Sequence, residues 1–479
     1  MKHFRIFSVV LFSFAAFQAN AQQTLGFFKN NVYNLHYNPA NEVKVRSHLG
    51  IGISNLNLQI GTNITTYNRL ISLDKEGNKV IHLDGLRATK NSYREFTCDL
   101  GLEVLGFGFH AGKNLYLTFS SRLRLDNAVF VPGDFLNLAV KGNISHIGEE
   151  MKILPLVSVL TYLDNSIGFQ YKINEKITIG ARGKLLVGML GANTKESHFT
   201  LMTDSEWNLH LKGSALVNLY APARFINDVE TISRLSDLDT LFNTNLFKIR
   251  TGLNSLGSSW GGGFDVGADV KITKNFGVKA SLMDMGWLKW NRNQDGAVSY
   301  KVEINPNHHL YQNGELVFAG MPFESIDFSD DLFTQFFDYI AIDSAFLFTK
   351  TTTKDYVMAT NPKLFLEGYY QLKCHIFSAL LRLNFIEKRT LPSFTLGYNF
   401  ELKKVIDIAL SYTMAKGSYG NFGVGVSLHF GDVFNFYLVT DHLIGAFFPL
   451  ANNSLNVQTG IYFTIPAKKA KKTAESEKQ

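Results

Sequence analysis

Long apolar runs and charged residues are both scarce in this chain of 479 residues. After residue 21, no segment is a continuous run of about 20 apolar residues, which is the length that a transmembrane helix needs. Charged residues make up 18% of the chain, whereas about 25% is typical of soluble domains. Hydrophobic residues reach 46%, and 40 residues are Phe. An apolar, aromatic chain without spanning helices is typical of a β-barrel that sits in a membrane.

Cysteine is scarce as well, and its placement argues against a disulfide. Cys98 and Cys374 lie far apart in strand-like segments, and Cys98 shares a strand face with Phe96 and Leu100. We interpret both as small apolar residues. The formal charge of +6 comes partly from lysines near the C-terminus, namely Lys468, Lys469, Lys471 and Lys472. This charge therefore does not indicate a nucleic-acid partner.

The first residues have the pattern of a secretory signal peptide. A basic start is followed by an apolar run over residues 6–17 and by Ala19-Asn20-Ala21, a small-x-small cleavage site. The apolar run is too short to serve as a membrane anchor. We expect residues 1–21 to be removed, with Gln22 as the mature N-terminus of an exported protein.

Two-residue alternation is the main pattern in the rest of the chain. From Leu115 to Leu125 the odd positions are mainly apolar, while the even positions include Arg122 and Arg124. One side of such a strand faces a hydrophobic medium and the other faces water. Segments of this kind predict fourteen spanning strands, at 47–60, 95–109, 114–126, 159–173, 177–193, 259–272, 276–290, 362–373, 376–387, 392–402, 405–414, 420–430, 433–441 and 454–465.

The connections between these strands fall into two classes. Turns of a few residues all lie at one end of the predicted strands, and the long polar stretches near 61–94, 127–158, 194–258 and 291–360 all lie at the other. Outer-membrane barrels have short periplasmic turns and long extracellular loops. The sequence therefore predicts an all-β fold: a fourteen-stranded antiparallel transmembrane barrel over residues 47–466, surrounded by outer-membrane lipid.

The long stretches also carry patterns of local structure. Residues 135–140 follow Pro132-Gly133-Asp134 and precede Gly142, which predicts a short helix. A second helix is predicted at 330–342, and residues 198–203 and 207–219 are expected to pair as a hairpin.

The last predicted strand resembles a signal for the barrel assembly machinery. Gly460, Phe463 and Ile465 fit its polar-x-Gly-x-x-aromatic-x-apolar form. The alternative is simply another amphipathic strand. The charged residues 467–479 that follow are expected to form a disordered periplasmic tail.

Three segments resemble the FadL-like outer-membrane barrels. Tyr37-Asn38-Pro39-Ala40, just after the signal peptide, is similar to an Asn-Pro-Ala element that is typical of that family. The segments 268–290 and 434–442 are similar to recurring segments of its Bacteroidota members, although His442 stands where those relatives often have Asn. The resemblance identifies the chain as a member of a Bacteroidota group related to FadL, PorV and PorP/SprF.

This resemblance implies a lumen plug. In FadL the N-terminal segment folds into the lumen as a hatch, and hydrophobic molecules leave sideways through the wall. By analogy, residues 22–46 plug this barrel, with Asn38, Pro39 and Ala40 at the core of the plug. Pro39 fixes its own φ and biases Asn38 toward an extended conformation, so the peptide turns sharply here. The alternative is an ordinary turn before a strand.

Two functions remain open at this point. The first is gated transport of a small hydrophobic ligand, as the FadL resemblance implies. The second is a scaffold or anchor for secretion-system or surface proteins, as the resemblance to PorV and PorP/SprF implies. Long loops often bind partners, which suits the second function.

Basic and acidic residues are nearly equal in number at the predicted inward positions. An open ion-selective pore usually carries one sign along its wall. We therefore interpret these residues as ion-pair candidates that brace a plugged lumen. The basic ones are Arg122, Arg124, Arg182, Lys184, Lys271, Lys279, Lys373 and Arg382; the acidic ones are Asp99, Glu103, Asp265, Asp269, Glu367, Glu401 and Asp407.

Catalytic, metal and cofactor sites are not indicated by the sequence. Histidines are scattered in loops or single on strands, unlike the Ser/His constellations of hydrolases. Gly261, Gly262 and Gly263 are not followed by Gly-Lys-Ser/Thr, so they predict no phosphate loop. Trp287 and Trp290 are expected to belong to the outer aromatic girdle.

Overall fold

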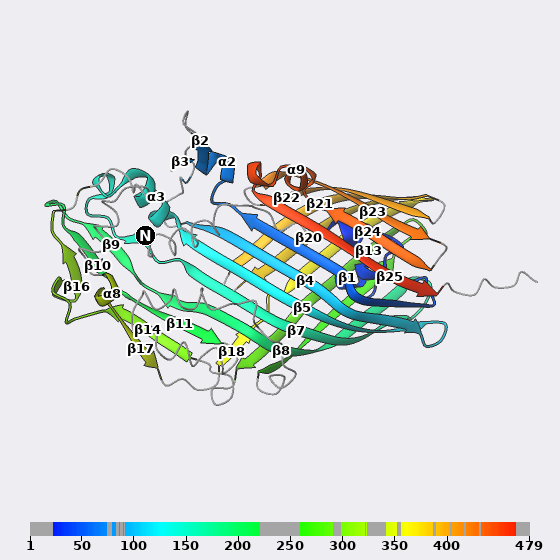
Figure 1. Cartoon of the computed structure of the whole chain (residues 1–479). Helices are drawn as coiled ribbons and strands as arrows, with labels where there is room; N and C mark the ends of the chain where they lie inside the picture. The colour runs from blue at the N-terminus through cyan, green and yellow to red at the C-terminus, as the bar shows by residue number, and fades with distance from the viewer. Residues whose placement is uncertain are drawn as a thin grey trace, which may run out of the picture.

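The alternating segments of the chain form antiparallel strands that close into a ring (Figure 1). The computed structural model describes residues 23–73, 79–82, 86, 90, 92–220, 259–290, 298–320, 322, 342–351, 356–386, 389–402, 405–415, 418–430 and 433–465. Within these residues, fourteen strands pair in chain order, and the last of them pairs with the first. This pairing confirms the predicted fourteen-stranded antiparallel barrel.

The barrel strands begin and end close to their predicted bounds, although two of them, β5 and β8, continue further than expected. The strands are β1 (Ser47–Thr62), β4 (Tyr93–His110), β5 (Leu115–Pro132), β7 (Leu156–Lys172), β8 (Ile177–Ser197), β12 (Trp260–Lys271), β13 (Phe276–Trp290), β19 (Lys363–Leu372), β20 (His375–Ile386), β21 (Arg389–Leu402), β22 (Ile406–Ala415), β23 (Ser418–Phe430), β24 (Phe434–Thr440) and β25 (Ser454–Ile465).

The alternation along each strand separates an apolar outer face from a polar inner face. On β23, Phe422, Val426 and Phe430 are exposed, whereas Ser427 and His429 are buried. We call the outward-facing apolar surface the apolar belt. It includes Leu49, Ile51, Phe107, Phe109, Ile167, Phe169, Leu185, Phe264, Leu366, Phe377, Phe394, Leu396, Leu410, Phe422, Phe430, Leu438, Phe463 and Ile465.

The helices of the structure are short. They are η1 (Thr24–Phe27), η2 (Val32–His36), α2 (Tyr67–Leu70), α3 (Gly133–Lys141), η4 (Ile144–His146), α8 (Ile342–Ala345), α9 (Leu443–Phe447) and η8 (Pro449–Ala451). Helix α3 confirms the helix predicted after Pro132, and it ends at Gly142, where φ is +64°. None of the described helices is long and apolar enough to cross a membrane.

Further strands extend the structure at the end of the barrel that carries the long connections (Figure 1). Strands β11 (Ser214–Tyr220), β14 (Val298–Ile304) and β17 (Phe346–Thr351) continue the sheet beyond β8, and β18 (Tyr356–Ala359) pairs with the end of β13. A separate sheet has the order β15 (Tyr311–Gln312), β16 (Glu315–Phe318), β10 (Leu209–Lys212), β9 (Thr200–Thr203) and β6 (Met151–Lys152). A small hairpin joins β2 (Ile71–Leu73) to β3 (Lys79–Ile81).

Three expectations need correction. The predicted strand 207–219 is broken at Gly213, where φ is +136°, so β10 pairs with β9 while β11 joins the barrel sheet. Lys373 lies exposed in the turn after β19, with a φ of +57°, and so does not face the lumen. Trp290 is buried and stacks on Tyr220 at 5.1 Å between ring centroids, so it is not part of an outer girdle.

The reason for the tryptophan error is geometric. Residues three apart on a regular strand face opposite sides, so Trp287 and Trp290 cannot both point outward. Trp287 is the exposed one. The predicted signal peptide, the charged tail and residues 330–341 of the second predicted helix lie outside the described residues.

Candidate functional site

The described N-terminal residues 23–46, here called the N-terminal segment, lie inside the ring of strands. Its apolar side chains form the main buried cluster together with inward-facing strand residues such as Tyr437 and Tyr462. The barrel interior is therefore packed largely by this segment. Its buried members are Leu25, Phe27, Phe28, Val32, Tyr33, Leu35 and Val43.

The first described residues are held by a carboxylate beyond the end of β24. The backbone N–H groups of Gln23 and Thr24 donate to Asp441 Oδ1 at 3.1 and 2.7 Å, and the Thr24 hydroxyl donates to the same oxygen. Gln23 also donates to Ser393 Oγ at 2.8 Å. Asp441 thus anchors the segment in the half of the lumen that lies toward the long connections.

The Asn38-Pro39-Ala40 turn lies against the opposite wall. Asn38 Oδ1 accepts the Ala40 N–H at 2.8 Å, and Asn38 Nδ2 donates to the carbonyl of Ala268 at 3.1 Å. Gly180 and Gly267 face this turn, and a Cβ on either would collide with Pro39 or Asn38. The turn therefore fits into a shallow recess that these two glycines leave open on β8 and β12.

His36 connects the segment to charged wall residues. Its Nδ1 lies 3.1 Å from both Arg122 Nη1 and Arg182 Nη1, and its Nε2 lies 2.9 Å from Glu103 Oε2. A guanidinium group only donates hydrogen bonds, so Nδ1 must accept and Nε2–H must donate to Glu103. Burial and the neighbouring arginines hold the pKa of His36 well below its usual value, so the ring is neutral.

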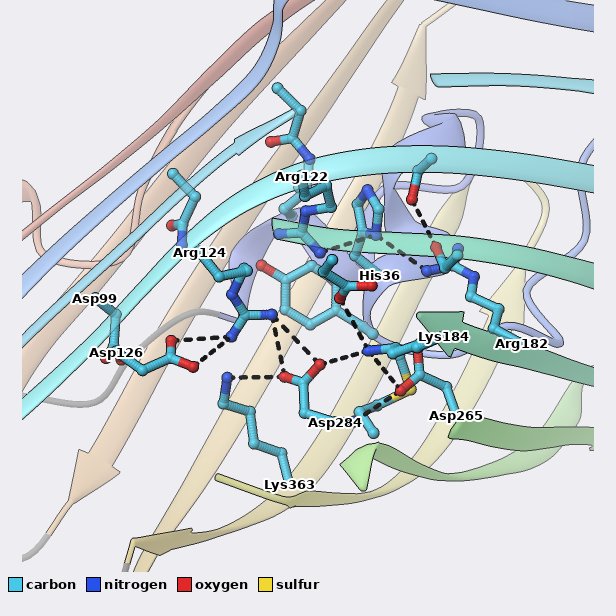
Figure 2. A pocket seen from close by; sticks show the side chains of 18 of the residues that line it. His36, Asp99, Arg122, Arg124, Asp126, Arg182, Lys184, Asp265, Asp284 and Lys363 are labelled. Carbon is cyan, nitrogen blue, oxygen red and sulfur yellow. Dashed lines mark hydrogen bonds and ion pairs between the residues drawn. The ribbon is translucent and has the colours of Figure 1, made fainter. Parts of the chain in front are cut away.

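Asp284 is the centre of a second group of charges (Figure 2). Its carboxylate lies 3.3 Å from Arg124 Nη1, 2.7 Å from Lys184 Nζ and 3.1 Å from Lys363 Nζ. Lys184 also pairs with Asp265 at 2.8 Å. These cations come from β5, β8 and β19. Strand β19 is paired with β13, which carries Asp284, whereas β5 and β8 are not, so the pairs with Arg124 and Lys184 join strands that are not neighbours.

These residues line a cavity with about 700 Å³ of empty space. Five cations and five carboxylates line it, so its fixed charges balance. The cations are Arg122, Arg124, Arg182, Lys184 and Lys363, and the carboxylates belong to Asp99, Asp126, Asp164, Asp265 and Asp284. We call this space the charged cavity. Among the described residues, no group of three or more His, Cys, Asp or Glu is arranged to hold a metal ion.

A second cavity, with about 320 Å³ of empty space, lies toward the end of the barrel that carries the short turns. Lys279 and Glu367 line this second cavity. Asp284 and Lys363 line the charged cavity and lie further from the short turns on the same two strands, β13 and β19. Tyr37 and Phe365 line both cavities, and their rings meet edge to face at 5.9 Å. This pair of rings therefore separates the two spaces.

The remaining predicted ion-pair candidates lie elsewhere along the lumen. Lys271 lies 3.5 Å from Glu42, Glu401 lies 3.7 Å from Lys29, and Asp407 accepts from the Asn30 backbone N–H at 3.3 Å, so these three contact the N-terminal segment. The others contact wall residues: Asp269 accepts from Tyr369, Glu367 pairs with Lys279, and Arg382 lies over the Phe365 ring.

Several residues of the site were missed by the sequence analysis. Asp126, Asp164 and Lys363 share the inward parity of Arg124, Ser166 and Glu367, so the alternation alone identifies them. Asp284 could not be found in this way because the pairing of β12 with β13 shifts beside it and its φ is +58°. His36 lies in a segment without periodicity, which carries no such signal.

The wall itself is interrupted in β1. Its pairing with β25 skips from Leu49 to Leu56, and its pairing with β4 skips from Ile51 to Asn55. Gly52 sits in the interruption with a φ of +79°. Ile51 and Ile53 point outward and are 67% and 64% exposed. We call residues 50–55 the β1 break.

A family model described as "Family of unknown function (DUF5723)" matches residues 39–441. The chain belongs to this family. The match begins at Pro39 within the buried turn and ends at Asp441, so in this DUF5723 member it includes the β1 break and the ten charged residues named above that line the charged cavity, whereas His36 lies outside it.

Solved structures of two toluene transporters and of a FadL homologue are similar to this DUF5723 protein at low identity. The Ralstonia pickettii toluene transporter TbuX is 13% identical with a TM-score of 0.38, covering 90% of this chain and 92% of its own. The Pseudomonas putida toluene transporter TodX is 9% identical with a TM-score of 0.36, covering 94% and 93%. A Pseudomonas aeruginosa FadL homologue is 11% identical with a TM-score of 0.28, covering 94% and 98%. Among curated proteins there is no match.

Proposed function

We propose that this protein is an outer-membrane barrel that passes small hydrophobic molecules through a gated lumen. The apolar belt supports the membrane location, because a water-exposed barrel would not place so many large apolar side chains outward. The signal-peptide pattern of residues 1–21 supports export, and the FadL-like motifs support transport.

The β1 break is the observation that carries this proposal. A continuous ladder seals a barrel wall, whereas the break leaves residues 50–55 outside the pairing with β25 and residues 52–54 outside the pairing with β4. The backbone of Ser54 lies against Gly460, where a Cβ would collide with the Ser54 carbonyl oxygen. Exposed Ile51 and Ile53 provide an apolar rim. A hydrophobic molecule can leave here into lipid without crossing water.

The N-terminal segment closes this exit from inside. The ring of Tyr33 packs against Tyr462 at 5.2 Å and Tyr437 at 5.7 Å, and its hydroxyl lies beside Gly50 of the break. Since His36 and Asp441 tie the same segment to the wall, passage requires the segment to move. Movement at Tyr37 also joins the charged cavity to the second cavity, because its ring lines both.

A reversible crosslink tests this gate. Thr24 Oγ1 and Ser411 Oγ lie 2.6 Å apart, close enough for Thr24→Cys and Ser411→Cys to form a disulfide. Cys98 and Cys374 are first replaced by Ala. Gram-negative cells that lack a transporter of this type express the variant, and uptake of radiolabelled toluene and oleate is measured. Oxidation is expected to reduce uptake to the level of cells without the protein, and dithiothreitol to restore it.

A matched disulfide controls for the chemistry. Ser299 Oγ lies 2.6 Å from Asn218 Oδ1, and the two residues face each other on the neighbouring strands β14 and β11, so a crosslink between Asn218→Cys and Ser299→Cys leaves the N-terminal segment free. It is expected to leave uptake unchanged. Equal uptake by the oxidised and reduced Thr24–Ser411 variants would disprove the gate. No uptake of either probe above background by the reduced protein would disprove transport.

A second candidate function is a scaffold for a secretion or surface assembly. The sheets formed by β9, β10 and β16 and by β11, β14 and β17 favour it, because they build a folded surface beyond the barrel with its own buried core. Affinity purification in mild detergent, analysed for lipids and proteins, separates the two functions. A bound lipid alone counts against the scaffold, and a stoichiometric protein partner alone counts against the transporter.

A further inference from the structure

Strand β24 is too short to complete its part of the wall. It pairs with residues 424–430 of β23 and residues 458–463 of β25. Residues 418–423 of β23 and 454–457 of β25 continue toward the extracellular side beyond its end. On the side that faces β24, the described part of the wall therefore has a space with no strand between β23 and β25.

Helix α9 occupies this space. It contacts both β23 and β25, and Figure 1 shows it at the end of the barrel away from the last residues of β25. Its start is fixed by His442, whose Nδ1 accepts the Gly445 N–H at 2.6 Å. Gly445 is buried against β25, where a Cβ would collide with the Ser454 carbonyl oxygen. One face of α9 is thus pressed into the wall.

The opposite face of α9 is apolar and exposed. Ile444, Phe447 and Phe448 follow the i, i+3, i+4 spacing that places side chains on one side of a helix. They are 49%, 72% and 65% exposed, and Leu450 beyond them is 48% exposed. Since Gly445 faces the wall, this face points away from the lumen.

The height of β24 places this face beside lipid. Its seven residues, at about 3.3 Å each and tilted by about 40°, rise about 18 Å. The apolar band of an outer-membrane barrel is about 25 Å tall. Helix α9 begins three residues after β24, so it lies within the upper part of that band. Phe422, at the level of α9 on β23, is part of the apolar belt and continues it to the helix.

We propose that α9 is a membrane-embedded panel of the barrel wall, and that Ile444, Phe447, Phe448 and Leu450 bind the acyl chains of outer-leaflet lipid. The inference rests on the proposed membrane location and goes beyond the proposed transport. The panel takes the place of the missing upper part of β24. Its backbone N–H and C=O groups can form hydrogen bonds within the helix, and its apolar face continues the apolar belt.

Site-directed spin labelling tests the panel in reconstituted full-length protein. Cys98→Ala and Cys374→Ala provide the background, and Phe447→Cys and Phe448→Cys carry a nitroxide. Phe422→Cys is the lipid-facing control, and Lys113→Cys in an exposed turn is the water-facing control. Collision with oxygen, which concentrates in acyl chains, and with a water-soluble nickel chelate is measured by power saturation. Labels at 447 and 448 are expected to match the label at 422.

The controls separate the two ways in which the inference can fail. If labels at 447 and 448 behave like the label at 113 while the label at 422 contacts lipid, the panel is wrong and the membrane location stands. If the label at 422 also behaves like a water-facing one, the membrane location fails and the panel fails with it. Labels at 447 and 448 that neither reagent reaches would mean a protein-covered face, which also overturns the proposal.

Discussion

Asp284 shows how one residue can organise a lumen. Its φ of +58° is uncommon for a residue other than glycine, and such a conformation persists only where its surroundings fix it. Here its backbone N–H donates to Asp265 at 2.7 Å, and its carboxylate receives three cations. The local conformation turns the side chain inward, and the cations hold it there.

Asp284→Asn is therefore expected to be strongly destabilising. The amide keeps the shape but leaves Arg124, Lys184 and Lys363 facing one another with one negative charge fewer. Removing one partner of a buried ion pair costs about 3–5 kcal/mol. The free energy of unfolding is measured by urea titration in phospholipid bilayers. Glu175→Gln, whose pair with Lys172 is on the surface, is the control, with a change below about 1 kcal/mol. Equal stability of the two variants would contradict the role of Asp284.

Gly460 has two explanations that an experiment can separate. The sequence places it in an assembly signal with Phe463 and Ile465, whereas the structure places it against Ser54 and Tyr437. Gly460→Ala is expected to lower the yield of folded protein even when purified chains refold into detergent without any assembly machinery. Phe463→Ala, on the exposed face of β25, is expected to refold normally. Normal refolding of Gly460→Ala would leave the assembly signal as the better explanation.

At the scale of elements, a histidine links strands and loops of the separate five-stranded sheet that contains β10. His210 on β10 lies 3.0 Å from Asp204 Oδ2 and 2.7 Å from Glu315 Oε1 on β16. Partial burial opposes the charge, but these two carboxylates raise the pKa of His210 above its usual value of 6.5. A raised pKa means that the charged ring contributes its full stability below 6.5, and that this stability is lost as the pH rises through the folded-state pKa.

The sheet is thus expected to be better protected in acid. Hydrogen exchange of residues 209–212 is measured at about pH 6 and about pH 9, on either side of the ordinary histidine pKa. Protection factors, corrected for intrinsic exchange, should be higher at the lower pH. His210→Gln should remove most of this difference. A larger protection factor at the higher pH in the native protein would reverse the sign and refute the assignment.

Elements differ in how far the sequence determines them. The barrel strands were predictable because a wall with lipid on one side imposes strict alternation on every strand. The predicted hairpin of residues 198–203 and 207–219 forms in part, because β9 pairs with β10. The transfer of β11 to the barrel sheet was not predicted. The break at Gly213 depends on a backbone conformation that one glycine among 39 does not reveal.

For the whole molecule, the packed lumen predicts that ions do not flow through the intact protein. The N-terminal segment fills the interior, and the charged cavity carries equal numbers of both signs. In a planar bilayer the intact protein is expected to show no large, steady conductance. Deleting residues 23–41 should produce one, and the milder Tyr33→Ala variant should give brief openings. A large, steady conductance of the intact protein would contradict the packed lumen.

The whole-molecule view also shows where sequence reasoning about the site ends. Arg122, Arg124, Arg182, Lys184 and Asp265 were identified as inward charges and do meet in one cavity. Which of these residues pair with which was not predicted, because contacts between β5, β8, β13 and β19 depend on the radius and closure of the ring. Alternation fixes which face a residue lies on, and it contains no information about what lies across the lumen.

The burial of Gln23 bears on how the N-terminal segment can be released. Its side chain is fully buried between Ser393 and Thr395, and its backbone N–H is bound to Asp441. At its other end the segment continues covalently into β1 at Ser47. The Gln23 end is held by hydrogen bonds, which can break and form again, so this end can leave the wall while the end at Ser47 stays attached.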